Sequence, residues 1–177
     1  MAGRSGAEVI SELYLSYAPA VLRWASRLGG PKADAEDIVQ EVFLIAQRSL
    51  HTVRDSDRIR SWLFQVTANE LRRRHRRDWL RRFLGDFPAD DAESAPDLRA
   101  TPEESFERRE AVELTYRILD SMADKYRTVL VLFQLEGMSG EEISELTGRK
   151  LATVWVHLHR ARADFLRRHQ AMKGAAR

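Results

Sequence analysis

The residues best suited to chemistry in this chain are arginines that follow a group of aromatic side chains. The stretch from residue 60 to 77 is RSWLFQVTANELRRRHRR, and five of the six residues from Arg72 to Arg77 are arginine. Its apolar beginning, with Trp62, can pack one end of a helix, while the arginines offer cations to a phosphate backbone and flat surfaces to unpaired bases. The alternative is an amphipathic helix whose basic face is only solvated.

Charge is distributed unevenly along the chain, although the net charge is only +2. From Arg60 to Arg82 eight arginines oppose two acids, and from Phe83 to Glu110 nine acids oppose three arginines. A basic block followed directly by an acidic block indicates a nucleic-acid surface beside a segment with a different role.

Residue types and spacing argue against catalysis and against a bound metal or cofactor. The chain has no cysteine, which excludes disulfides, thiolate metal sites and cysteine nucleophiles. His157 and His159 are two residues apart, so on a helix they point in roughly opposite directions and cannot share one metal. The adjacent acids Glu36–Asp37 diverge on a helix, and no phosphate-binding loop or dinucleotide fingerprint occurs. We expect no enzymatic activity and no cofactor.

Length and hydropathy limit the architecture. At 177 residues, of which 44% are hydrophobic and 32% charged, the chain has room for one domain or two small ones. Residues 1–8 contain no apolar signal core, and no apolar run is long enough to span a bilayer. We therefore expect no membrane span and a cytoplasmic location.

The apolar pattern is helical throughout and predicts an all-α fold, since no segment alternates as a strand would. The first helical stripe covers residues 9–28; Pro19 is expected to kink or divide it, and Gly29–Pro31 to end it. A second helix is expected from near Ala33, with Ile38 and Val42 turned inward.

Residues 84–105 have the composition of a linker. They contain three prolines, many acids and few large apolar side chains, so they cannot bury enough surface to fold alone. Thr101 is expected to cap a helix that has Pro102 in its first turn and continues to about Asp120.

The last third, residues 106–170, carries strong local signals. Ser121–Asp124 and Ser139–Glu142 each have the spacing of a capping box, and Gly148 permits a tight turn. The helix after that turn has an apolar stripe of Leu151, Val154, Leu158, Ala161 and Phe165. Any pair of antiparallel helices can show this pattern, but a basic tail favours a DNA-binding helix-turn-helix: Arg160, Arg162, Arg167 and Arg168.

Three segments together resemble bacterial extracytoplasmic-function (ECF) sigma factors of the sigma-70 family. They are DAEDIVQEVFLIA (34–46), RSWLFQVTANELRRRHRR (60–77) and MSGEEISELTGRKLATVWVHLHRAR (138–162), within a resemblance that covers roughly residues 9–168. The resemblance implies a promoter-specificity subunit of RNA polymerase with two small helical domains joined by a flexible acidic linker. Residues 8–83 would bind the polymerase clamp and the minus-ten element, 84–105 would be the linker, and 106–170 would bind the minus-thirty-five element.

The resemblance implies a polymerase-binding surface on the second helix. Asp37, Gln40 and Glu41 match the family's clamp-binding positions, and their spacing of three and four places them along one helical side. Ordinary solvated polar residues are the alternative. Partners implied are core RNA polymerase (beta-prime clamp and beta flap), promoter DNA and an anti-sigma factor.

The minus-ten contacts implied by the resemblance come from the Trp62 helix and the loop before it. Val53–Asp57 corresponds to the loop that cups a flipped base in the family. The amide of Asn69 suits a base edge, while Trp62 belongs to the melting region or serves mainly to pack its helix. The full set is Arg54, Arg60, Ser61, Trp62, Gln65, Asn69, Arg72, Arg73 and Arg76.

The expected recognition helix departs from the family pattern. Relatives commonly have TV[KR]SR[LI] where this chain has TVWVHL at 153–158. Trp155 and Val156 cannot make the bidentate base contacts of arginine. Either they touch thymine methyls or sugar edges, or Trp155 packs beside Leu151 and Leu158. The implied minus-thirty-five set is Lys150, Thr153, Trp155, Val156, His159 and Arg160.

Two other functions remain open from sequence alone. One is a helix-turn-helix DNA-binding regulator that does not join polymerase; it explains residues 121–168 but leaves the segments 34–46 and 61–77 without a role. The other is an interaction module whose recognition helix binds protein.

Overall fold

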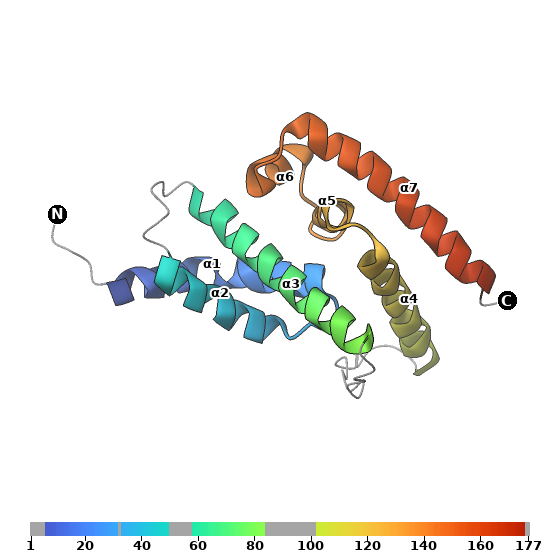
Figure 1. Ribbon diagram of the computed structural model, residues 1–177, viewed down its shortest axis with the longest axis horizontal. Coiled ribbons are helices and arrows are strands. Elements are labelled where there is room, and N and C mark those ends of the chain that lie inside the picture. Colours follow the sequence, from blue (N-terminus) through green and yellow to red (C-terminus); the bar gives the residue numbers. More distant parts are fainter. Residues whose placement is uncertain (1–5, 32, 50–57, 84–101, 176–177) are drawn as a thin grey trace.

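The computed structural model describes residues 6–31, 33–49, 58–83 and 102–175, and over these ranges the chain is α-helical without strands. Figure 1 shows the helices in chain order. Their bounds are α1 Gly6–Gly29, α2 Ala35–Ser49, α3 Ile59–Phe83, α4 Pro102–Ser121, α5 Asp124–Gln134, α6 Gly140–Thr147 and α7 Leu151–Ala175. The all-α expectation is confirmed. The loop Val53–Asp57, Thr101 and most of the expected linker lie outside the described residues.

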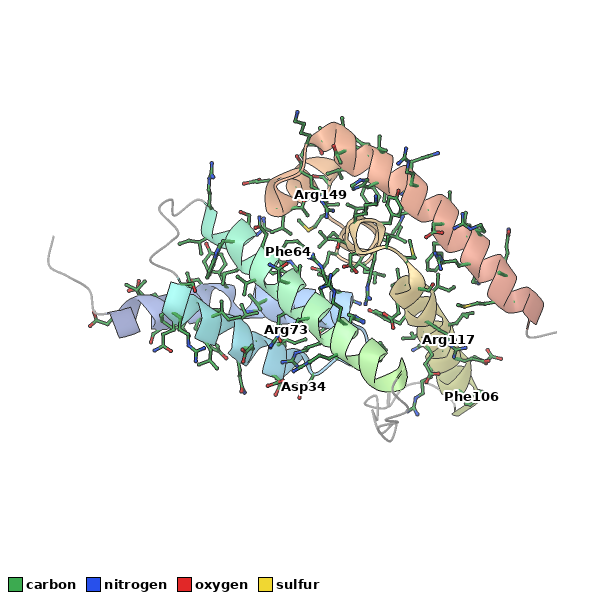
Figure 2. All side chains as sticks on the ribbon, in the orientation of Figure 1. Asp34, Phe64, Arg73, Phe106, Arg117 and Arg149 are labelled. Atoms are coloured by element: carbon green, nitrogen blue, oxygen red, sulfur yellow. The ribbon has the colours of Figure 1, made fainter. Side chains whose placement is uncertain are left out.

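Helices α1, α2 and α3 pack against one another and form an N-terminal unit. Val21, Ile38, Val42 and Leu63 have no exposed surface, and Trp24 is 1% exposed. The Trp24 ring meets Phe64 edge-on, with ring centroids 5.3 Å apart; Figure 2 marks Phe64 on α3. Full burial of such side chains contributes about 1.5–3 kcal/mol each, so this core holds α2 and α3 in a defined register.

The ends of α1 and α2 follow local chemistry, with one correction. Pro19 does not divide α1, which is one helix because buried residues on both sides of the proline, Leu13 and Val21, pack into the same core. Gly30, at φ 79°, ends α1 as expected. The second helix begins at Ala35, near the expected Ala33, since Asp34 Oδ1 accepts the Asp37 N–H at 2.9 Å and caps it.

Helices α4 to α7 form a C-terminal unit in which α4, α5 and α6 contact α7. The Ser139–Glu142 capping box is present, and Gly148 ends α6 at φ 67°. The capping box expected at Ser121–Asp124 is wrong: the N-cap of α5 is Ala123, without a side-chain bond. Ser121 instead ends α4, where its hydroxyl donates to the Ile118 carbonyl at 2.7 Å.

The apolar stripe expected on α7 is mostly buried. Val154, Leu158 and Ala161 lie in the core and Phe165 is half-buried, but Leu151 is 36% exposed. Leu151 is the first residue of α7 and is exposed, so its expected inward position is wrong.

The two units contact each other through α3 with α6 and α1 with α5, and Figure 1 shows α3 between the α1–α2 pair and the C-terminal unit. The Tyr116 ring lies against Gly30, where an added Cβ would be 2.5 Å from Tyr116 Cδ1. Glu136 pairs with Arg23 and Arg27 at 3.7 and 3.6 Å. Within the described ranges, no helix has the length and apolar character needed to cross a bilayer.

Candidate nucleic-acid interface

Helix α3 divides into a buried side and an exposed polar side. Leu63, Phe64, Thr67 and Leu71 are buried, and the Thr67 hydroxyl bonds the Leu63 carbonyl at 2.8 Å. The exposed side carries five of the expected minus-ten residues: Gln65, Asn69, Arg72, Arg73 and Arg76. A single helix therefore presents cations and amides in one direction while its opposite side holds it in the core.

The other expected minus-ten residues are placed differently. Trp62 is half-buried and packs against the core, and Ser61 is half-buried with its hydroxyl bonded to the Arg58 carbonyl at 3.2 Å. Arg60 lies over the Trp24 ring at 6.0 Å, a distance that allows a cation–π contact. Arg54 lies outside the described residues.

Two of the exposed α3 residues meet the C-terminal unit. Arg72 Nε pairs with Asp124 Oδ2 at 3.0 Å, and the Gln65 amide nitrogen is 3.9 Å from where a Cβ would lie on Gly148. In this arrangement of the units, part of the polar side of α3 is covered by α5 and the turn after α6.

The expected polymerase-binding residues follow the exposed side of α2. Asp37 and Gln40 are exposed and Glu41 is half-buried, whereas their neighbours Ile38 and Val42 are fully buried. These three residues therefore lie along one side of α2, as their spacing predicts.

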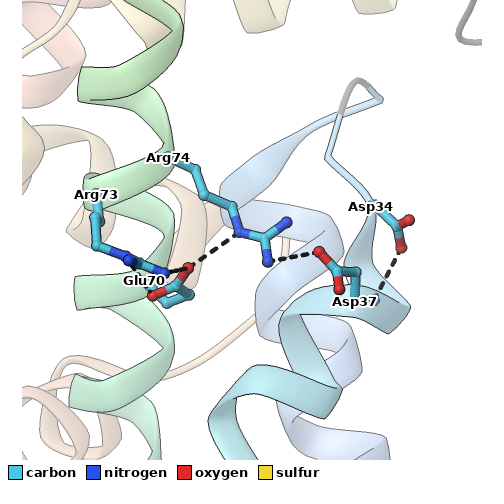
Figure 3. A network of polar contacts seen from close by, with 5 residues as sticks. All are labelled: Asp34, Asp37, Glu70, Arg73 and Arg74. Atoms are coloured by element: carbon cyan, nitrogen blue, oxygen red, sulfur yellow. Dashed lines mark hydrogen bonds and ion pairs between the residues drawn. The ribbon is translucent and has the colours of Figure 1, made fainter.

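A charged network links α2 to α3, and sequence analysis did not find it. Asp37 Oδ2 pairs with Arg74 Nη2 at 2.7 Å, and Arg74 Nε bonds Glu70 at 3.2 Å. Arg73 bonds the two oxygens of Glu70 at 2.8 and 2.9 Å (Figure 3). Glu70 is 4% exposed. Its position three and four residues before two arginines on one helix is the signal that could have identified it.

Burial raises the pKa of Glu70, but hydrogen bonds and charge from Arg73 and Arg74 outweigh burial, so the net pKa lies below its ordinary 4.5. Burial lowers the pKa of Arg74, and its bonds to Asp37 and Glu70 more than reverse this. Glu70, Arg73 and Arg74 are therefore charged near neutral pH.

Helix α7 exposes five of its six expected DNA-contacting residues. Lys150, just before the helix, is exposed, as are Trp155, Val156, His159 and Arg160; Thr153 is half-buried. The opposite side holds the helix on α5 and α6, with the buried residues described above. Figure 2 marks Arg149 in the turn that leads into this surface.

Trp155 combines exposure with packing. The side chain is 45% exposed, yet its ring lies on Gly140, where a Cβ would be 2.5 Å from the ring atom Cζ2. The Phe133 ring is 6.0 Å away in an edge-on orientation. Trp155 thus packs on the start of α6, and part of its surface remains available.

His157 lies beneath this surface, among cations. Its ring meets Tyr126 edge-on at 5.5 Å, and its buried Nδ1 has no hydrogen-bond partner among the described residues. Burial, followed by the charges of Arg149, Lys125 and Arg160, lowers the pKa of His157 below 6.5. The neutral imidazole is the form that this environment favours at neutral pH.

Other arginines on α7 are engaged within the unit. Arg167 and Arg168 both pair with Asp164, and Arg168 also reaches Ser121 at 3.0 Å. Arg162 lies over the Phe133 ring at 5.1 Å. Over the described part of the chain Arg160 forms no such pair, so its charge is available to a ligand.

Both units match known families. Sigma-70 region 2 matches residues 13–81, which include the Asp37 and α3 surfaces, and Sigma-70 region 4 matches residues 112–165, which include the helix-turn-helix. Two solved structures share the fold: CnrH in complex with the cytosolic domain of CnrY (TM-score 0.57, 23% identity, 95% of this chain and 89% of that chain) and RpoE in complex with the anti-sigma factor NepR from Bartonella quintana (TM-score 0.61, 20% identity, 90% and 96%).

Related sequences extend over both units. RNA polymerase sigma factor NccH of Alcaligenes xylosoxydans xylosoxydans is 30% identical over 154 residues, covering 86% of this chain and 82% of NccH. ECF RNA polymerase sigma factor SigE of Mycolicibacterium smegmatis is 32% identical over 166 residues, but this chain spans only 62% of its length. RNA polymerase sigma factor YlaC of Bacillus subtilis is 28% identical, with 88% of each chain covered. With both regions in order along one chain, this protein belongs to the ECF group of the sigma-70 family of RNA polymerase sigma factors.

Proposed function

We propose that this chain is a promoter-specificity subunit that binds core RNA polymerase and directs DNA-dependent initiation by recognising and melting promoter DNA. The observation that carries the proposal is the presence, in one chain, of an exposed basic side on α3 within region 2 and a capped helix-turn-helix in region 4. A regulator that acts without polymerase would need only the second of these.

The N-terminal unit, residues 8–83, is the half proposed to capture the minus-ten element as single strand. Separated strands need cations along the backbone and surfaces or pockets for extruded bases. Exposed arginines on α3, with Asn69 among them, supply both kinds of contact. Trp62 supports this surface by packing, because it is half-buried.

The C-terminal unit, residues 106–170, is the half proposed to bind the minus-thirty-five element as duplex. Lys150 and Arg160 would contact phosphates and His159 a base edge or phosphate, while Trp155 and Val156 offer apolar surface to thymine methyls. The packing of Trp155 on Gly140 and Phe133 favours such rigid apolar contact.

Polymerase binding is assigned to Asp37, Gln40 and Glu41 for the beta-prime clamp, and to the C-terminal unit for the beta flap. The acidic segment 84–105 would connect the two attachment points. All nucleotide chemistry would belong to the polymerase, so the chain adds no catalytic group and needs no cofactor. It would act in the cytoplasm, where polymerase and promoter meet.

An anti-sigma factor is a further proposed partner. The two solved structures described above are complexes, CnrH with the cytosolic domain of CnrY and RpoE with the anti-sigma factor NepR. A partner of this kind would bind the same two units that polymerase needs.

Co-purification with core polymerase, followed by promoter-dependent transcription, tests the proposal. We expect a stable complex and transcripts from selected promoters only when this chain is added. The double substitution Asp37→Arg and Glu41→Arg should abolish both, and the exposed Glu12→Arg on α1 is the matched control for charge reversal. Binding to duplex promoter DNA without any complex with polymerase would favour the regulator instead.

A further inference from the structure

The network around Glu70 joins the surface proposed for polymerase to the surface proposed for DNA. Glu70 and Arg73 lie on α3, Asp37 lies on α2, and Arg74 is the only member of the four that contacts an acid on each helix in the described structure (Figure 3). A buried carboxylate is costly unless it is paired, and Glu70 is paired twice. The ion pair with buried Glu70 therefore fixes the position of the Arg74 guanidinium.

Asp37 is held by this arrangement while remaining reachable. Its backbone N–H is bonded to Asp34, which anchors it in the first turn of α2. Its side chain is 56% exposed, whereas that of Arg74 is 22% exposed. A cation from a binding partner can thus reach the Asp37 carboxylate from solvent, but it must replace Arg74 to pair with it fully.

The charges of the network change when that replacement occurs. In the free chain, two carboxylates (Asp37 and Glu70) balance two guanidinium groups (Arg73 and Arg74). When a partner's cation neutralises Asp37, Glu70 alone opposes the two arginines, and one positive charge on α3 is no longer compensated. That charge lies on the α2-facing side of α3, the helix whose exposed side is proposed to hold single-stranded DNA.

We propose that Arg74 is a positioning residue that competes with RNA polymerase for Asp37, and that polymerase binding releases its charge toward DNA. This inference rests on the proposed function of Asp37. Because the coupling is reciprocal, DNA that engages Arg74 strengthens polymerase binding by the same factor. In the free chain Asp37 and Glu70 together hold Arg74 at the junction of α2 and α3; once polymerase takes Asp37, only the pair with Glu70 remains.

The first test measures equilibrium affinity of the full chain for core polymerase. Arg74→Gln should bind about threefold more tightly, the range expected for loss of one partly exposed competing ion pair. Asp37→Asn should bind more weakly. The double variant should match Asp37→Asn, because Arg74 has no carboxylate to withhold once Asp37 is replaced. Arg77→Gln removes the same charge from an exposed site on α3 and should leave the affinity unchanged.

The second test measures binding of holoenzyme to single-stranded minus-ten DNA at several salt concentrations. Each phosphate contact by a cation contributes a slope of about 0.7 to the dependence of log affinity on log salt. Holoenzyme carrying Arg74→Gln should lose about that much. An unchanged slope would overturn the release of charge toward DNA.

The outcomes separate the inference from the assignment on which it rests. Normal polymerase affinity of folded Asp37→Asn would remove the clamp assignment itself. If Asp37→Asn binds weakly but Arg74→Gln binds no more tightly, or tightens equally when Asp37 is replaced, the competition is refuted and the assignment stands. Should Arg74→Gln fail to fold, Arg74→Met keeps the aliphatic stem without the cation and carries the same expectations.

Discussion

Arg127, on α5, donates a hydrogen bond through Nη2 to the backbone carbonyl of Leu28, at the end of α1 and ninety-nine residues away. Its Nη1 pairs with Asp120 at 2.8 Å and contacts His75 Nε2 at 3.1 Å. The Tyr116 hydroxyl donates to the neighbouring Arg27 carbonyl at 3.3 Å. The last turn of α1 has carbonyls without helical partners, and here the C-terminal unit supplies their donors.

Under the proposed function, this arrangement of the two units cannot serve both promoter elements at once. Positions minus ten and minus thirty-five are about 25 base pairs apart, and at about 3.4 Å per base pair they are separated by about 85 Å. Helix α3 contacts α6, and α7 with its 25 residues is only about 37 Å long. The proposed function therefore requires the units to move apart when both elements are bound.

Arg127→Met should shift the free protein toward the open arrangement. The substitution removes the donor to α1 but leaves Asp120 44% exposed, so no buried charge is stranded. Because the chain has no cysteine, Ser16→Cys and Gln170→Cys can carry two labels, one on each unit. We expect a longer mean distance between them by energy transfer.

Arg117→Met, at an exposed arginine of α4, is the control for that measurement. If the label distances of Arg127→Met match those of the control, Arg127 does not hold the units together.

Asn69→Ala and Arg76→Ala should affect promoters in different ways. Both residues are exposed on α3, but an amide can recognise one base edge whereas a guanidinium contacts phosphates regardless of sequence. We expect Asn69→Ala to change preference at one minus-ten position, and Arg76→Ala to weaken all promoters and reduce salt dependence. Binding across a promoter library would reveal the contrast, and two variants altering only sequence preference would contradict it.

Trp155→Lys should change the preferred minus-thirty-five sequence while the protein stays folded, since the side chain is 45% exposed. Gly140→Ala tests the packing side of the same residue. Its Cβ would meet the Trp155 ring, so we expect a loss of about 1–3 kcal/mol in the free energy of unfolding. Chemical denaturation measures the free energy of unfolding of both variants. Unfolding of Trp155→Lys would mean that the ring is needed in the core and does not select DNA sequence.

Arg160→Ala should weaken duplex binding and reduce its salt slope by about 0.9, the value for one phosphate contact on B-form DNA. Lys173→Ala removes a positive charge from the far end of the same helix and is the control. Equal effects from both substitutions would show that only the overall charge of α7 matters.

His157 should make the C-terminal unit less stable in mild acid. Burial and nearby cations lower the pKa of His157 in the folded protein below 6.5. As pH falls through 6.5, the unfolded chain binds a proton that the folded chain does not, so stability is lost below that value. The substitution His157→Gln removes the imidazole. It should flatten the dependence of stability on pH between about pH 7.5 and about pH 5, as measured by thermal unfolding. A profile identical to that of the unaltered protein would exclude His157 as its cause.

Short-range patterns in the sequence were enough to determine much of the helical framework. Ser139 and Glu142 cap α6 because both bonds close within three residues, and Gly148 ends it because glycine adopts positive φ without strain. Ile38 and Val42 are buried because their spacing matches one helical turn. The residue types of α3 and α7 likewise predicted which surfaces carry cations and amides.

Tertiary packing decided what those surfaces contact. Ser121 had the spacing of a cap, yet the turn between α4 and α5 placed Ala123 at that position. Arg74 reaches Asp37, and Arg127 reaches Leu28, only because helices distant in sequence pack side by side. Periodicity and capping act over three or four residues, whereas the pairing of a long charged side chain depends on which helix lies within its reach, and that is set by the whole core.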